Sequence, residues 1–335
     1  MIRALRDSCR TAASQALQAC FLQCRGEMKD MKKAVCTFLT ALMAVSLAAC
    51  GNSSSAPAAS ASAEPEASAS AAPAETQATA ETTSAESEYY FLQEDLGRES
   101  YAIGFRKEDE ELAATVSGAV KALVKNGTFD EIGKKYPDIY DYFCLKAADI
   151  DDADLPEQGS GDSSYTFKHG FDLDYPPYSY MQDDGSIGGF DVELAQAVCE
   201  YLGWKYEPVP FNWEAKDMEL NAGSCDCIWS GFTKEGREDK YAWGITYSDN
   251  TQGILVKKGS GIETLDDLSG KIVGVQIDTA ASEKLNDSQK DLAATFGELK
   301  TYETYTVAFN DLKAGAIDAI AIDMTAGAFL ISSAS

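Results

Sequence analysis

From Ser87 to Ser335, short β-prone runs alternate with stretches whose apolar residues recur at helical spacing. This alternation is typical of an α/β fold, in which helices connect the strands of a sheet. We expect strands over residues 101–105, 166–170, 225–230, 252–256, 272–276 and 317–322. We expect helices over residues 112–124, 129–136 (ending before Pro137), 192–202, 278–285 and 307–313.

The residues before Ser87 have a different composition. Residues 28–49 begin with Lys29, Lys32 and Lys33 and continue into an apolar stretch that is too short to span a bilayer, as in a signal peptide. This segment ends in Leu-Ala-Ala-Cys, which resembles the lipobox of bacterial lipoproteins and predicts a lipid on Cys50. Residues 1–27 would then be an upstream extension, with translation starting at Met28 or Met31.

Residues 50–86 are almost wholly Ala, Ser, Glu, Thr and Pro after the cysteine. Such a stretch lacks the large apolar side chains that a core requires. We therefore expect a disordered linker between a lipid anchor in the membrane and the folded part of the chain.

Charge and residue usage exclude several functions. The chain of 335 residues has 28 Lys and Arg against 54 Asp and Glu, and its net charge of −26 would repel nucleic acid. His169 is the only histidine, so a histidine-rich metal site is nearly excluded, and a Ser-His-Asp mechanism would have to use that one residue. We expect no metal, no cofactor and no catalytic residue, and we interpret Cys225 and Cys227 as buried free thiols.

Several motifs follow one another in order from residue 165 onward. GFDVELAQAVCEYL (189–202) is preceded by DLDYPPYSY and followed by WEAKDMELNAGSCDCIWSGFTKEGRE, YSDNTQGILVKK, LDDLSGKIVGVQ and FNDLKAGAIDAIAID. Together they resemble the bacterial extracellular solute-binding proteins of family 3, the polar amino-acid class that serves ABC importers. The resemblance implies a type II periplasmic-binding-protein-like fold, in which two α/β lobes joined by two crossover strands close on a small ligand.

The order of the segments departs from that family. Residues 100–136 resemble the family's carboxy-terminal end, yet they precede the part that resembles its beginning, and the chain stops at Ser335, where relatives would continue. We expect a circular permutation; a fusion of two gene fragments is the alternative. The expected boundaries are 87–99 (end of lobe 2), 100–144 (carboxy-terminal part of lobe 1), 145–164 (connector), 165–250 (amino-terminal part of lobe 1) and 251–335 (lobe 2).

The resemblance also implies a ligand site for a zwitterionic amino acid. Arg237 corresponds to the partner of the ligand carboxylate, although the interval from Thr233 is one residue shorter than in relatives, and Asp323 corresponds to the ammonium acceptor. Asp172 occupies the position at which basic-amino-acid binders carry an acid, which favours a polar or basic ligand. Asp278 is expected to cap the helix that follows it. The full predicted site is Asp172, Tyr175, Trp213, Ser230, Gly231, Phe232, Thr233, Arg237, Gln276, Thr279 and Asp323.

The resemblance implies a monomer anchored to the extracellular face of the membrane, with an ABC permease as partner. Two other functions stay open. An enzyme on the same fold, such as a dehydratase or a cell-wall lyase, would need an acid or base, for which His169 and Glu214 are the candidates. The other is a ligand-sensing module without transport.

Overall fold

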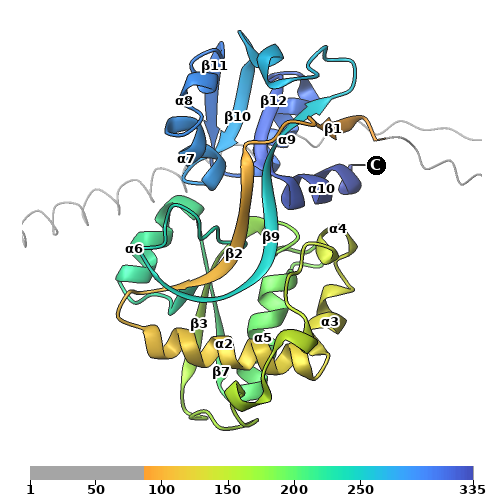
Figure 1. Cartoon of the computed structure of the whole chain (residues 1–335). Coiled ribbons are helices and arrows are strands. Elements are labelled where there is room, and N and C mark those ends of the chain that lie inside the picture. Colours follow the sequence, from red (N-terminus) through yellow and green to blue (C-terminus); the bar gives the residue numbers. More distant parts are fainter. Residues whose placement is uncertain (1–86, 335) are drawn as a thin grey trace, which may run out of the picture. The chain divides into compact units, whose positions relative to one another are not determined.

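The computed structural model describes residues 87–334. The expected extension (1–27), signal peptide (28–49), lipid site at Cys50 and linker (50–86) lie outside these residues. Two lobes are present, and both are α/β (Figure 1).

Two long antiparallel strands connect the lobes. β2 (Gly97–Phe105) and β9 (Ala242–Lys257) pair along their length and run from one lobe into the other (Figure 1). The described residues form one nine-stranded sheet with the order β11-β10-β12-β9-β2-β8-β3-β7, in which β1 pairs with β9 beside this path. The two crossover strands that the resemblance implies, at 249–252 and 99–101, are therefore paired stretches of these continuous strands.

Lobe 1, as we use the name, contains the strands at the β7 end of this sheet and the helices that cover them. Phe190 of α5 stacks on Phe143 with ring centroids 4.1 Å apart, which joins α5 to the segment after α4. The elements are α2 (Glu110–Lys125), α3 (Thr128–Gly133), α4 (Pro137–Tyr140), β3 (Thr166–Asp172), β4 (Asp174–Tyr175), β5 (Ser179–Met181), β6 (Ile187–Gly188), α5 (Phe190–Leu202), β7 (Lys205–Phe211), α6 (Lys216–Asn221) and β8 (Cys227–Ile228).

Lobe 2 contains the strands at the β11 end of the sheet. Its core gathers aliphatic side chains of β9, β10, β12 and α7, including Ile254, Val275 and Leu285. The elements are β1 (Tyr89–Phe91), β10 (Ile272–Gln276), α7 (Ala280–Asn286), α8 (Lys290–Ala293), β11 (Glu298–Tyr302), α9 (Tyr305–Ala314), β12 (Ala319–Asp323) and α10 (Met324–Ser333).

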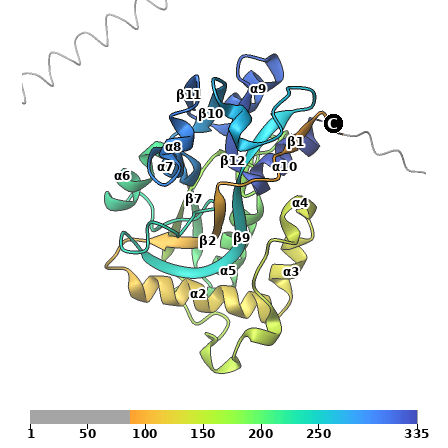
Figure 2. The same ribbon diagram turned by 45° about the horizontal axis from the view of Figure 1, so that its top comes forward.

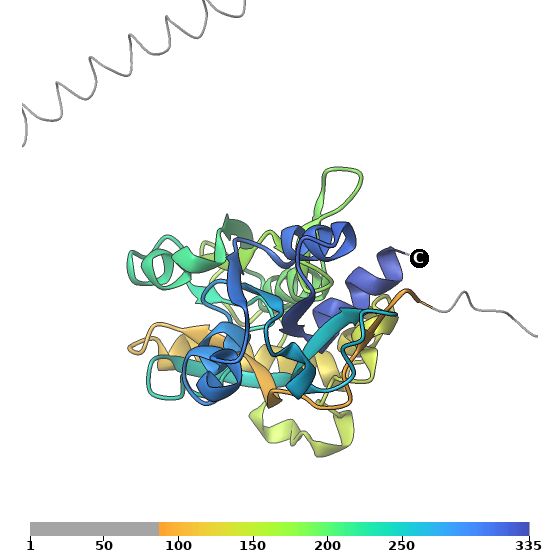
Figure 3. The same ribbon diagram turned by 90° about the horizontal axis from the view of Figure 1, so that it is seen from above.

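The first described segment of the chain packs into both lobes. β1 pairs with β9 in lobe 2, and β2 lies between β8 and β9. Figure 2 shows α2 and α3 covering lobe 1 next to α5, while Figure 3 shows β1 beside α10, where Gly327 lies close to the ring of Phe91. Residues 87–144 and the residues that follow the connector thus build one folded body.

Several local expectations were wrong. The helix expected over 129–136 does end before Pro137, but α3 already stops at Gly133, and Pro137 begins α4 because its fixed φ suits the first helical position. The expected strand over 225–230 is reduced to Cys227–Ile228, since the chain turns at Gly231 toward the pocket described below. β7 and β11 were missed because their exposed, charged residues hide the two-residue alternation.

The cysteine expectation is confirmed within the described residues: Cys225 and Cys227 are free and buried. His169 is also buried; its ring bonds to the hydroxyl of Tyr206 (3.0 Å) and to the carbonyl of Trp229 (2.6 Å), and burial lowers its pKa to about 4. Among residues 87–334, no helix is long and apolar enough to cross a membrane.

The turn into α5 gives a stability prediction. Gly189 has φ +118°, and a Cβ there would lie 2.3 Å from the carbonyl oxygen of Tyr178, whereas Gly185 has φ +82° and open space around it. We expect Gly189→Ala to lower the free energy of unfolding by at least about 3 kcal/mol, or to prevent folding, because strain and overlap add. The control Gly185→Ala should cost only about 1 kcal/mol. Chemical denaturation measures both, and equal losses would contradict this reading of the turn.

Candidate ligand-binding site

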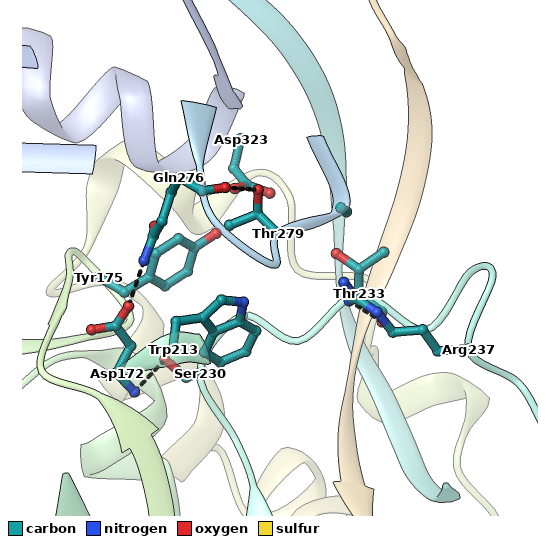
Figure 4. A pocket seen from close by; sticks show the side chains of 11 residues that line it. Asp172, Tyr175, Trp213, Ser230, Thr233, Arg237, Gln276, Thr279 and Asp323 are labelled. Carbon is teal, nitrogen blue, oxygen red and sulfur yellow. Dashed lines mark hydrogen bonds between the residues drawn. The ribbon is translucent and has the colours of Figure 1, made fainter. Parts of the chain in front are cut away.

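A pocket lies between the two lobes, where the ends of strands from both meet (Figure 4). The cavity among its side chains is small, about 20 Å³, because side chains of the two lobes contact each other across it. Every predicted site residue except Phe232 lines it, and Ala280 joins them. The lining residues are Asp172, Tyr175, Trp213, Ser230, Gly231, Thr233, Arg237, Gln276, Thr279, Ala280 and Asp323.

Phe232 lies behind the pocket wall. Its ring packs edge-on against Trp213 at 5.5 Å and Tyr241 at 5.1 Å, and it is fully buried. Gly231 has φ +53°, and a Cβ on it would lie 2.5 Å from the ring of Tyr175. The left-handed turn brings the backbone to the pocket and leaves Phe232 to support Trp213 from behind.

Asp191 holds the turn at Gly231 in place. The sequence did not identify this residue as part of the site. Its Oδ2 accepts the backbone N–H of Gly231 (2.7 Å) and the hydroxyl of Tyr247 (2.7 Å). Burial raises the pKa of Asp191 to about 7. The residue belongs to the motif GFDVELA, and its buried acceptor fixes the loop that carries Ser230 and Thr233.

The acidic end of the pocket follows from strand register. Asp323 pairs with Gln252 across β12 and β9, and Glu99 pairs with Asn250 across β2 and β9. Since paired residues and residues two apart share a face of the sheet, these side chains and that of Tyr101 project together. Asp323 Oδ1 accepts hydrogen bonds from the Tyr101 hydroxyl (2.8 Å) and from the amides of Asn250 (2.8 Å) and Gln252 (2.5 Å).

These bonds orient the Asp323 carboxylate. Asp323 stands at the N-cap position of α10, yet its side chain makes no capping bond to that helix. Asp323 therefore does not use its carboxylate to cap α10. Glu99, Asn250 and Gln252 were not predicted, because polar residues on a crossover strand have no signature until the register is known.

Asp172 ends β3 on the opposite wall. Its Oδ2 accepts the amide of Gln276 from lobe 2 (2.8 Å), and Oδ1 accepts the backbone N–H of Asp174 (3.0 Å). Burial raises its pKa to about 6, although these two hydrogen bonds lower it. The structure gives this carboxylate no cationic partner among the described residues.

Arg237 is buried at the basic end. Its Nη1 donates to the carbonyl of Thr233 (3.2 Å; Figure 4), and its guanidinium lies 5.2 Å from the ring centre of Phe232. From lobe 2, Glu283 Oε2 lies 3.0 Å from Nη2. The predicted guanidinium thus faces the pocket region while contacting both lobes.

The turn before α7 brings the lobes together. The carbonyl of Asp278 accepts the indole N–H of Trp213 (2.9 Å), Nζ of Lys216 (3.3 Å) and Nη2 of Arg237 (3.4 Å). Asp278 has φ +56° and does not cap α7, which corrects our expectation. Thr279 is the cap, because its hydroxyl accepts the N–H of Ser282 (3.3 Å).

The candidates for an enzyme lie elsewhere. His169 is enclosed by its two partners and Glu214 is exposed, and neither lines the pocket. Within residues 87–334, no three His, Cys, Asp or Glu side chains gather as a metal cluster would.

The fold is a pair of α/β lobes with a polar pocket between them. Residues 167–307 match the model of the bacterial extracellular solute-binding proteins, family 3. The chain belongs to this family, and its fold is of the type II periplasmic-binding-protein class.

Two curated relatives agree with this assignment. The chain is 33% identical over 165 residues to the L-cystine-binding protein TcyJ of Escherichia coli, and the match covers 48% of this chain and 60% of TcyJ. It is 32% identical over 157 residues to the arginine-binding extracellular protein ArtP of Bacillus subtilis, covering 46% of this chain and 59% of ArtP. A histidine-bound substrate-binding protein of an ABC uptake transporter from Streptococcus pneumoniae shares 33% identity, with coverage of 50% and 70% and a TM-score of 0.49. The chain thus spans about 60% of the length of the curated relatives it matches.

Proposed function

We propose that this protein binds a free amino acid between its lobes and delivers it, chemically unchanged, to an ABC importer. The observation that supports this most is the pairing of a buried guanidinium, Arg237, with a buried carboxylate, Asp323, around one interlobe pocket. An amino acid carries one charge of each sign, and each charge must be satisfied when it leaves water. Arg237 would bind the carboxylate and Asp323 the ammonium group.

The pocket favours a polar or basic side chain. Asp172 is buried and has only neutral donors among its described hydrogen bonds, so a ligand cation or donor would find an acceptor there. Tyr175 and Trp213 would enclose the aliphatic part of the ligand. The relatives are named for cystine and arginine, and the solved relative holds histidine; all three carry polar side-chain groups or charges.

The guanidinium of Arg237 is already held in position at the pocket without a ligand. Glu283, which pairs with it, is half exposed, so its carboxylate can turn to water when a ligand carboxylate takes its place. Micromolar binding requires about 8 kcal/mol. Three or four charge-assisted hydrogen bonds of roughly 1.5 to 3 kcal/mol each, less the cost of ordering, supply that amount.

A screen with a matched pair of variants tests this proposal. We expect one or more of the twenty amino acids, with polar or basic side chains foremost, to raise the melting temperature of the protein. Arg237→Ala should weaken binding of that amino acid at least 100-fold in calorimetry, because a charged partner is lost. Arg98→Ala removes an exposed arginine and should leave affinity unchanged. Binding that survives Arg237→Ala at full affinity would exclude the proposed pose.

We further propose that the protein works as a monomer on the extracellular face of the membrane, held by a lipid on Cys50 and partnered by a permease. The support is the lipobox-like sequence before Cys50 and the family's place outside the cytoplasm. Expressed in a bacterium, the wild type should partition with membranes and carry a diacylglyceryl mass on its first peptide. Cys50→Ala should lose both; a membrane-bound Cys50→Ala protein would contradict the anchor.

We also propose that the chain is a circular permutant of the family's order. The support is that β2 pairs between β8 and β9 while α2 packs on β9, although both precede β3 in sequence. The domain boundaries given above follow from this proposal.

Restoring the family's order tests the permutation. A chain with residues 165–335 followed by residues 87–144 through a short flexible linker should fold with a similar melting temperature and bind the same amino acid. Circular dichroism and calorimetry measure both properties. An unfolded product, alongside a well-folded chain of residues 87–335 in its own order, would argue against permutation.

A further inference from the structure

Two carboxylates at the crossover strands share their hydrogen-bond donors. The amide of Asn250 donates to Glu99 Oε1 (2.9 Å) and to Asp323 Oδ1 (2.8 Å), and the amide of Gln252 donates to the same two oxygens at 2.7 and 2.5 Å. A primary amide has two N–H groups, so each amide gives one to each acid. Glu99 and Asp323 are thereby joined into one unit, which we call the carboxylate pair.

The members of the carboxylate pair differ in access. Asp323 lines the pocket, whereas the side chain of Glu99 is fully buried behind it. Glu99 Oε1 also accepts the hydroxyl of Thr233 (2.9 Å), but the buried Oε2 has no hydrogen-bond partner among the described residues. A proton on Oε2 would therefore disturb none of the existing hydrogen bonds, although it would weaken the ion pair with Lys284.

Charged and titratable groups face Glu99 from several elements. Burial and the charge of Asp323 on β12 both disfavour the charged form of Glu99. Lys284 of α7 lies 3.9 Å from Glu99 Oε2. The buried phenols of Tyr101 on β2 and Tyr305 on α9 also face it. Burial first, and then the charge of Asp323, raise the pKa of Glu99 to about 7. Both phenols have their pKa raised by burial and stay neutral, so Lys284 is the one cation beside the carboxylate pair in the described part of the chain.

We propose that the carboxylate pair recognises the ligand's ammonium group as a unit, with Glu99 protonated in the empty pocket and losing that proton to solvent when the ammonium group binds Asp323. This proposal rests on the proposed function. The ammonium charge cancels the repulsion between the two acids, so the second carboxylate can ionise and add its attraction. Glu99 is then a positioning residue that acts through Asp323 and the two shared amides.

Because ligand binding is coupled to loss of the Glu99 proton, the direction in which affinity changes with pH is determined. A proton released on binding makes affinity rise with pH across the range in which Glu99 titrates in the empty protein. With a starting pKa of about 7, wild-type protein should release about half a proton at pH 7 and nearly one at pH 6. Affinity should rise about tenfold from pH 6 to pH 8.

Calorimetric titration in phosphate and in bis-Tris buffer, both of which buffer between pH 6 and pH 7, measures the released protons, because the two buffers differ in heat of ionisation. The probe is each free amino acid that raises the melting temperature in the screen. The imidazole of L-histidine itself titrates in this pH range, so for this ligand the number of protons released by each variant is compared with the number released by the wild type. Glu99→Gln should keep the fold and abolish proton release at pH 7. Glu214→Gln is the matched control: it removes an exposed carboxylate that does not line the pocket, and proton release at pH 7 should equal that of the wild type.

Each outcome decides the proposal. Binding without proton release by the wild type at pH 6 and pH 7 would overturn it, even where Glu99→Gln fails to fold. Proton release that survives in a folded Glu99→Gln protein would overturn it as well. If no amino acid binds, the proposed function fails and this inference fails with it, a result that differs from binding without proton release.

Discussion

The register among β12, β9 and β2 is the constraint on which the rest of the structure depends. It places Asp323 opposite Gln252 and Glu99 opposite Asn250, so that acids and amides meet on one face at the crossover between the lobes. A slip of one residue would turn these side chains to the other face and remove the acidic end of the pocket. Lobe connection and ligand recognition thus share the same hydrogen bonds.

The two ends of the pocket are built differently. The acidic end is part of the sheet, and its donors are fixed before any ligand arrives. The basic end depends on contact between the lobes, since Arg237 meets Glu283 and the carbonyl of Asp278 from lobe 2. Under the proposed function, one end fixed by the sheet and one end that depends on contact between the lobes suit a protein that must hold a ligand and later release it.

The resemblance to a known family named Arg237 and Asp323 as ligand partners before the fold was known. Both residues line the pocket between the lobes. Phe232 was misplaced because the left-handed Gly231 reverses the side-chain direction, which spacing alone does not reveal. Glu99 and Asn250 were missed because they meet only through pairing of strands about 150 residues apart in sequence.

A crystal structure of the protein with the amino acid selected by the screen measures the central claim directly. The ligand carboxylate should lie within hydrogen-bonding distance of the Arg237 guanidinium, and its ammonium group should lie against Asp323. A ligand bound in the reverse orientation, or outside the pocket between the lobes, would contradict the proposed recognition of an amino acid by this pair of charges.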